Sequence, residues 1–103
     1  MRRTATALDE ARRWRALPAE DLLWESFGED AVVYNRRSGE THFLNCTAAE
    51  TLRILQDRAA TLAEVVAEIG GRFGLEPQAG LAEQVGRAIE EFERAGLICW
   101  SAP

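Results

Sequence analysis

The side chains that could support catalysis are few, and they lie in no known catalytic arrangement. The candidates are Ser26, Ser38, His42 and Cys46, together with carboxylates scattered along the chain. None lies in a GxSxG, HExxH, P-loop or GxGxxG context, which would activate a nucleophile, hold a metal or cradle a phosphate. We therefore interpret His42, beside Phe43, as a strand residue rather than a general base, and we expect no enzymatic activity.

Metal-ligating residues are also sparse. The chain has two cysteines, Cys46 and Cys99, which form no CxxC pair, and it has one histidine. A structural zinc site takes about four such ligands, and a disulfide framework takes several cysteine pairs. We expect no metal site and no cofactor.

Length and charge favour a binding module. The 103 residues, 47% hydrophobic and 28% charged, suit one globular domain that holds a modest core and a surface groove. A net charge of -5 argues against nucleic acid as a partner. No stretch approaches the roughly 20 apolar residues of a membrane span. Charged residues also interrupt the region where a secretory signal needs an apolar run. We expect a cytoplasmic protein with no membrane partner.

The N-terminal half has the pattern of a three-stranded antiparallel meander. Three short β-rich runs, divided by turn residues, cover 22–27, 31–36 and 41–45. Both faces of the middle run are at least half apolar, so the pattern does not assign its buried face. The third run ends the meander and should form a sheet edge with unpaired backbone groups, unless the N-terminal arm covers it.

The segment before the meander gives weaker signals. Residues 1–13 carry few large apolar groups, so we expect a flexible N-terminus followed by one domain over residues 14–100. Trp14 to Leu17 could form a short strand or a packing arm before Pro18, which removes a backbone donor.

The C-terminal half is predicted to be helical. Two capping boxes, Thr47–Glu50 and Thr61–Glu64, precede apolar stripes and predict helices at about 47–57 and 61–73. A third helix should begin after Pro77 and end at a left-handed C-cap, with the next two residues folding back as a hydrophobic contact.

This order predicts an α+β fold, winged-helix-like, with a three-stranded antiparallel sheet followed by three helices that cover one of its faces. The winged-helix layout raises DNA binding as a function. The exposed face of the third helix, however, carries four carboxylates against two guanidinium groups, which would repel phosphates. Its charged residues are Glu83, Arg87, Glu90, Glu91, Glu93 and Arg94. An edge strand beside an amphipathic helix suits an extended peptide better, because the peptide can add as a further strand.

The chain also resembles a known family over residues 22–98. The most specific part of the resemblance is the LNxT box that opens a helix ahead of Asp57. The matching residues include Val32-Val33-Tyr34-Asn35, Ser38-Gly39, Leu44-Asn45-Cys46-Thr47, Phe92 and Ala95-Gly96-Leu97-Ile98. They are similar to the PqqD-like family of RiPP recognition elements, and most similar to the branch called the HPr-rel-A system PqqD family peptide chaperone.

The resemblance implies a non-catalytic chaperone that binds the leader of a ribosomally made precursor peptide. It also implies a peptide-modifying enzyme as second partner, a radical SAM protein or an HPr-kinase-related system. The leader would add to the third strand, so the implied docking edge is the backbone of Thr41, His42, Phe43, Leu44 and Asn45. It would also lie against the third helix.

The groove side of the third helix is a separate prediction, made from a helical wheel. One flank holds Gln84, Ala88, Glu91 and Ala95, with Val85 and Ile89 as the proposed groove floor. The other flank holds Ala82, Gly86 and Glu93, so the pattern leaves the groove-facing side open. We interpret the LNxT box as helix initiation, with Leu44 in the core and Thr47 as cap, rather than as part of the site.

Two other functions remain open at this point. The same sheet edge could serve a general protein-interaction or dimerisation module, and the layout alone allows a DNA-binding winged helix. The expected oligomeric state is a monomer or a weak homodimer.

Overall fold

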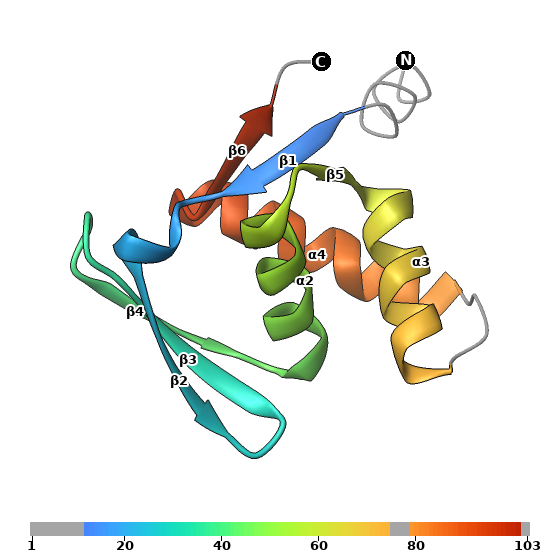
Figure 1. Cartoon of the computed structure of the whole chain (residues 1–103), viewed down its shortest axis with the longest axis horizontal. Helices are drawn as coiled ribbons and strands as arrows, with labels where there is room; N and C mark the ends of the chain where they lie inside the picture. Colours follow the sequence, from blue (N-terminus) through green and yellow to red (C-terminus); the bar gives the residue numbers. More distant parts are fainter. Residues whose placement is uncertain (1–11, 75–78, 102–103) are drawn as a thin grey trace.

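Two small sheets and three α-helices make up the part of the chain that the computed structural model describes, residues 12–74 and 79–101 (Figure 1). The elements, in chain order, are β1 (Arg13–Ala16), the 3-10 turn η1 (Ala19–Asp21), β2 (Leu22–Phe27), β3 (Asp30–Asn35), β4 (Glu40–Leu44), α2 (Cys46–Asp57), β5 (Ala60–Thr61), α3 (Leu62–Phe73), α4 (Ala79–Ala95) and β6 (Ile98–Ser101). The predicted α+β class is confirmed, with a three-stranded antiparallel sheet followed by three helices.

The predicted meander is the sheet β2-β3-β4, and its strands end within one residue of the predicted limits. Its buried face, which the sequence pattern left open, carries Ala31 and Val33 in the middle strand. Asn35 is buried on the same face, which is possible because its side chain forms hydrogen bonds within the adjacent turn. Its Oδ1 accepts hydrogen bonds from the backbone N–H groups of Arg37 and Ser38, which closes the turn into β4.

The N-terminal arm forms a strand, one of the two alternatives for residues 14–17, and it starts at Arg13. Strand β1 pairs antiparallel with β6 along four residue pairs and with the two-residue β5, making a second sheet of order β5-β1-β6. It therefore does not cover β4. Strands β5 and β6 were not predicted. The flexible N-terminus was predicted over residues 1–13, of which residues 1–11 lie outside the described residues and Arg13 belongs to β1.

The N-cap of helix α2 lies two residues before the predicted one. Asn45, not Thr47, is the N-cap, and its side-chain oxygen accepts a hydrogen bond of 2.8 Å from the backbone N–H of Ala48. Thr47 lies inside the helix, so the predicted first capping box is wrong. Asn45 also falls outside β4, whose last residue is Leu44. The second box is confirmed, because Thr61 and Glu64 each accept from the other's backbone N–H.

Helix α4 ends as predicted at a left-handed glycine. Gly96 has a φ of 78°, and its N–H donates to the carbonyl of Glu93. The N–H of Leu97 donates to the carbonyl of Phe92, which completes a Schellman motif. This turn sends Leu97 and Ile98 back into the core, and the chain continues as β6.

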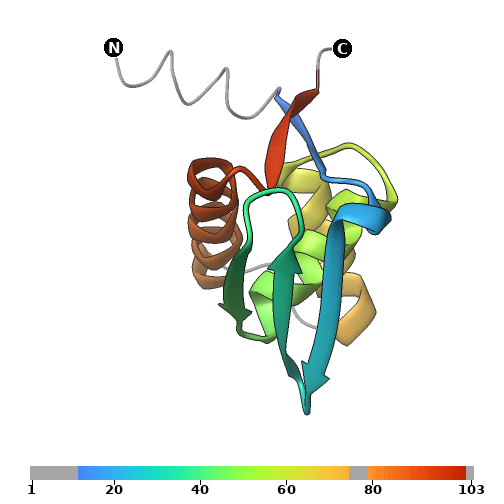
Figure 2. The ribbon, with the colours of Figure 1, turned by 90° about the vertical axis from the view of Figure 1, so that its left-hand side faces the viewer.

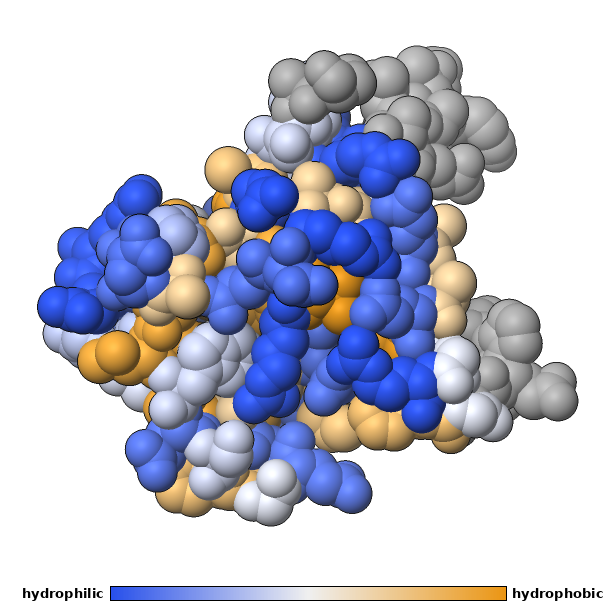
Figure 3. Space-filling model, in the orientation of Figure 1, coloured by the Kyte–Doolittle hydropathy of each residue, from blue (hydrophilic) through white to orange (hydrophobic). Residues whose placement is uncertain are grey.

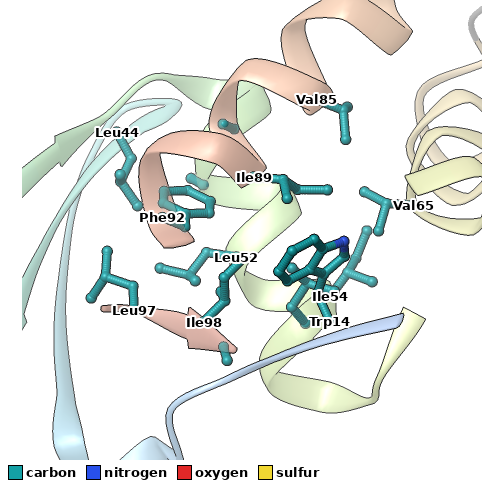
Figure 4. Close-up of a cluster of buried hydrophobic side chains, with 14 of the residues drawn as sticks. Trp14, Leu44, Leu52, Ile54, Val65, Val85, Ile89, Phe92, Leu97 and Ile98 are labelled. Atoms are coloured by element: carbon teal, nitrogen blue, oxygen red, sulfur yellow. The ribbon is translucent and has the colours of Figure 1, made fainter. Parts of the chain in front are cut away.

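Helix α2 lies at the centre of the molecule and contacts both sheets and both other helices. Figure 4 shows Leu52 of α2 among Phe92, Leu97 and Ile98. On the sheet side, the indole N–H of Trp24 donates to Gln56 Oε1 at 3.0 Å, and the guanidinium of Arg53 stacks 4.5 Å from the Trp24 ring. These contacts fix α2 against the buried face of β2-β3-β4.

The capping carboxylate of α3 predicts how stability depends on pH. The backbone N–H of Thr61 and then the guanidinium of Arg13, 2.7 Å from Glu64, lower the pKa of the Glu64 carboxyl. The ionised Glu64 carboxylate therefore stabilises the fold at pH values above the ordinary carboxyl pKa. This stabilisation is lost as the pH falls through the lower pKa of the folded state. We expect the free energy of unfolding of Glu64→Gln, measured by urea titration, to fall less steeply with decreasing pH than that of the wild type. Parallel curves for the variant and the wild type would contradict this assignment.

Candidate peptide-binding groove

Strand β4 is an open edge beside a helix. Among the described residues it pairs with β3 alone, so its other side carries unpaired backbone N–H and C=O groups. Figure 2 shows β4 as the strand of its sheet nearest to α4. The side chains alternate along β4, with His42 and Leu44 turned toward the core and Thr41 and Phe43 exposed.

A hollow of about 240 Å³ lies between β4 and the C-terminal end of α4. Its floor is apolar, because Leu44, Phe92 and Leu97 line it and are buried in the core. Ala95 is small and leaves room above that floor. The other lining residues are Thr41, His42, Phe43 and Glu91.

A second hollow of about 470 Å³ continues along α4 past the end of β4. It is lined by Asn45, Thr47, Ala48, Gln84, Arg87, Ala88 and Glu91. Glu91 lines both hollows, so the two adjoin, and we call them together the β4–α4 groove. The residue types that line it differ along its length, with more apolar residues at the Phe92 end and polar residues and charges of both signs at the Gln84 end.

Eight of the ten predicted site residues line this groove, namely Thr41, His42, Phe43, Leu44, Asn45, Gln84, Ala88 and Glu91. The residues predicted as the groove floor lie elsewhere. Val85 is fully buried in the core, and Ile89 lines a third hollow with Trp14 and Gly86 on the opposite flank of α4. The floor is formed by Leu44, Phe92 and Leu97 instead. The flank of α4 that faces β4 is the one holding Gln84, Ala88, Glu91 and Ala95.

Sequence reasoning did not place five of the lining residues in the groove, which are Thr47, Ala48, Arg87, Phe92 and Leu97. The LNxT motif could have indicated that Thr47 lines the groove. With Asn45 as N-cap, the residues that follow it form the first turn of α2, which lies at the groove wall. The C-cap at Gly96 could likewise have indicated the position of Leu97, because it turns the chain back toward β4. Both residues were interpreted only as structural.

Two reactive side chains near the groove are poorly placed for catalysis. His42 is mostly buried, and its Nε2 has no hydrogen-bond partner among the described residues, the nearest carboxylate oxygen being Glu40 Oε1 at 3.7 Å. Burial, and then the carboxylates of Glu29, Glu50 and Asp30, raise the pKa of the Cys46 thiol. The thiol is thereby kept protonated, which makes it a weak nucleophile.

Neither a metal centre nor a membrane span is found in the described part of the chain. Residues 12–74 and 79–101 bring no three His, Cys, Asp or Glu side chains together where they could hold a metal ion. Within the same ranges, no helix has both the length and the apolar character to cross a bilayer.

Comparisons with known proteins identify one family and one solved structure with a similar fold. The family described as coenzyme PQQ synthesis protein D (PqqD) matches residues 30–98, which include both walls of the groove. The solved structure of TbiB1 in complex with the TbiA(beta) leader peptide has a similar fold, with a TM-score of 0.63 and 10% sequence identity. The alignment covers 86% of this chain and 99% of that chain. No curated protein matches the chain significantly.

Proposed function

Because the chain belongs to the PqqD family, we propose that it is a non-catalytic peptide chaperone that binds the leader of a ribosomally made precursor peptide. The structural likeness to a protein solved with a leader peptide supports the same reading. The second partner in this proposal is the enzyme that modifies the precursor. The chaperone holds the leader while the rest of the precursor enters that enzyme.

The observation that carries the proposal is the open edge of β4 beside the β4–α4 groove. An extended peptide can pair its backbone with the five residues of β4 and so satisfy the unpaired edge groups. Its side chains alternate, so every second one points toward α4 and enters the groove. Backbone pairing supplies affinity that does not depend on sequence, and the groove supplies the specificity.

The groove also suggests which side chains it takes. The hollow over Leu44, Phe92 and Leu97 suits an apolar side chain, because a side chain that enters it leaves water and packs on three apolar groups. The hollow between Asn45 and Gln84 suits a polar or charged side chain, since Arg87 and Glu91 offer charges of both signs there. A leader with one apolar and one polar anchor on the same face of the added strand fits both hollows.

Two alternatives compete with this function. A second copy of the chain could pair with β4, and it would then exclude the leader from the same edge. DNA binding is disfavoured by α4, where the carboxylates outnumber the guanidinium groups and Glu83 lies 3.9 Å from Arg87.

Hydrogen exchange tests the strand addition. The leader can be identified by pulling the full chain down from its host and sequencing the bound peptides by mass spectrometry. With that peptide at saturation, we expect exchange to slow at alternate amides of Glu40–Leu44, because only every second N–H of an edge strand points to its open side. The control is β2, the other edge of the same sheet, whose exchange should stay unchanged. Protection confined to α2 and α3 would mean that the peptide binds elsewhere.

A further inference from the structure

Phe43 is unusually exposed for a large apolar side chain on an edge strand. Its side chain is 84% exposed and projects from the outer face of the sheet, away from the helices. The strand register places Val32 directly opposite Phe43, and Tyr34 opposite Thr41 on the same face. Figure 3 shows hydrophobic residues (orange) at the surface on its left side, where the sheet β2-β3-β4 lies in Figure 1. Leu23 and Tyr34 are also exposed on this face, and exposed apolar residues that gather on one face are typical of an interaction surface.

The position of Phe43 limits what can cover it. The residue lies on β4 itself, so it borders the groove at the strand although its ring projects to the outer face. Any strand that pairs with the open side of β4 places one side chain opposite Phe43 on the outer face, with Cβ atoms about 5 Å apart. Its diagonal neighbours lie within reach of an aromatic ring. A peptide added to β4 therefore cannot avoid Phe43.

We propose that the peptide added to β4 is read on both faces, with inward side chains entering the β4–α4 groove and an outward apolar side chain packing on the ring of Phe43. This inference rests on the proposed function, because strand addition at β4 is its premise. Successive residues of a strand point to opposite faces. The recognised segment therefore carries its outward apolar residue directly next to an inward anchor, and not only at alternate positions.

The chain offers a matched pair of variants for the test. Phe43→Thr removes the ring and keeps a residue with high β-propensity, and the fold should tolerate it because the side chain is exposed. Phe27→Thr is the control. Phe27 is 60% exposed on the outer face of β2, at the opposite edge of the same sheet. Phe43→Leu is a second variant that keeps an apolar side chain at the tested position.

The probe is a phage-displayed library of random 12-residue peptides, selected against the full chain and each variant. We expect peptides selected by the wild type to share two adjacent apolar positions, and those selected by Phe43→Thr to lose one of them. A peptide selected by the wild type should bind Phe43→Thr about fivefold more weakly. It should bind Phe27→Thr with unchanged affinity, and Phe43→Leu within about threefold of the wild type.

The outcomes separate this inference from the proposed function. Selected peptides that bind Phe43→Thr as tightly as the wild type would overturn the two-face reading and leave groove binding intact. Peptides that give no protection of β4 in hydrogen exchange would contradict the proposed function itself. If Phe43→Thr instead converts a dimer to a monomer in sedimentation and leaves the selected sequences unchanged, Phe43 serves a second copy and the inference is wrong.

Discussion

Replacing Ala88 with tryptophan is expected to weaken leader binding by about thirtyfold or more, while the domain stays folded. Ala88 is 7% exposed and lines the larger hollow of the groove. An indole at this position would occupy the space proposed for a peptide side chain, and loss of one buried anchor typically costs about 2 kcal/mol or more. Isothermal titration with the leader measures the affinity, and urea unfolding shows whether the variant is folded.

The fold should survive Ala88→Trp because the hollow is large and open at the surface. Overpacking inside a closed core costs about 1–3 kcal/mol, and a domain of this size is typically stable by about 5–15 kcal/mol. The matched control is Glu90→Trp, which places the same indole on the opposite flank of α4, beside the hollow that Gly86 and Ile89 line. It should leave affinity unchanged. Wild-type affinity for Ala88→Trp would show that the groove is not the site.

The meander could be predicted from sequence because its signals are local. Turns containing Gly28 and Gly39 separate short β-rich runs, and both glycines adopt the positive φ that such turns use. The start of α3 at Thr61 and the end of α4 at Gly96 could also be predicted from local signals, since capping depends on residues within one turn of a helix end. The α+β class followed from these elements and their order.

The start of α2 was misplaced because two residues could have capped it. Thr47 and Glu50 have the spacing of a capping box, but β4 ends at Leu44, and Asn45 is therefore the first residue free to cap. Glu50 does not reach back to the helix start. Its carboxylate instead contacts Arg72 of α3 at 2.6 Å, a long-range ion pair that joins two helices. A local sequence pattern does not indicate a partner so far along the chain.

The second sheet and the groove flank depend on contacts between distant parts of the chain. Strand β1 finds its partner in β6, at the other end of the chain, and a four-residue strand carries little signal by itself. Both flanks of α4 hold small residues, so a helical wheel could not decide between them. In the structure, Trp14 of β1 and the preceding Arg12 line the hollow on one flank, and the other flank faces β4.

Trp14→Ala should be the most destabilising of the substitutions considered. Trp14 is 5% exposed in the central core and pairs across the strands with Trp100. Removing a buried tryptophan typically costs about 3–5 kcal/mol, a large share of the stability of a small domain. At about 4–8 °C for each kcal/mol, the midpoint of thermal unfolding should fall by roughly 15 °C or more. Calorimetry or circular dichroism measures this shift.

Trp100→Ala is the matched control, because this paired tryptophan is 56% exposed and should cost less than half as much. The comparison also tests where the folding unit begins. The family match starts at residue 30, yet Trp14 of β1 packs in the same core as Leu52 and Ile98. A midpoint for Trp14→Ala close to that of the wild type would place β1 outside the folding unit. If the midpoint falls as expected, affinity measured well below it should stay near wild type, because Trp14 lies on the flank of α4 away from the β4–α4 groove.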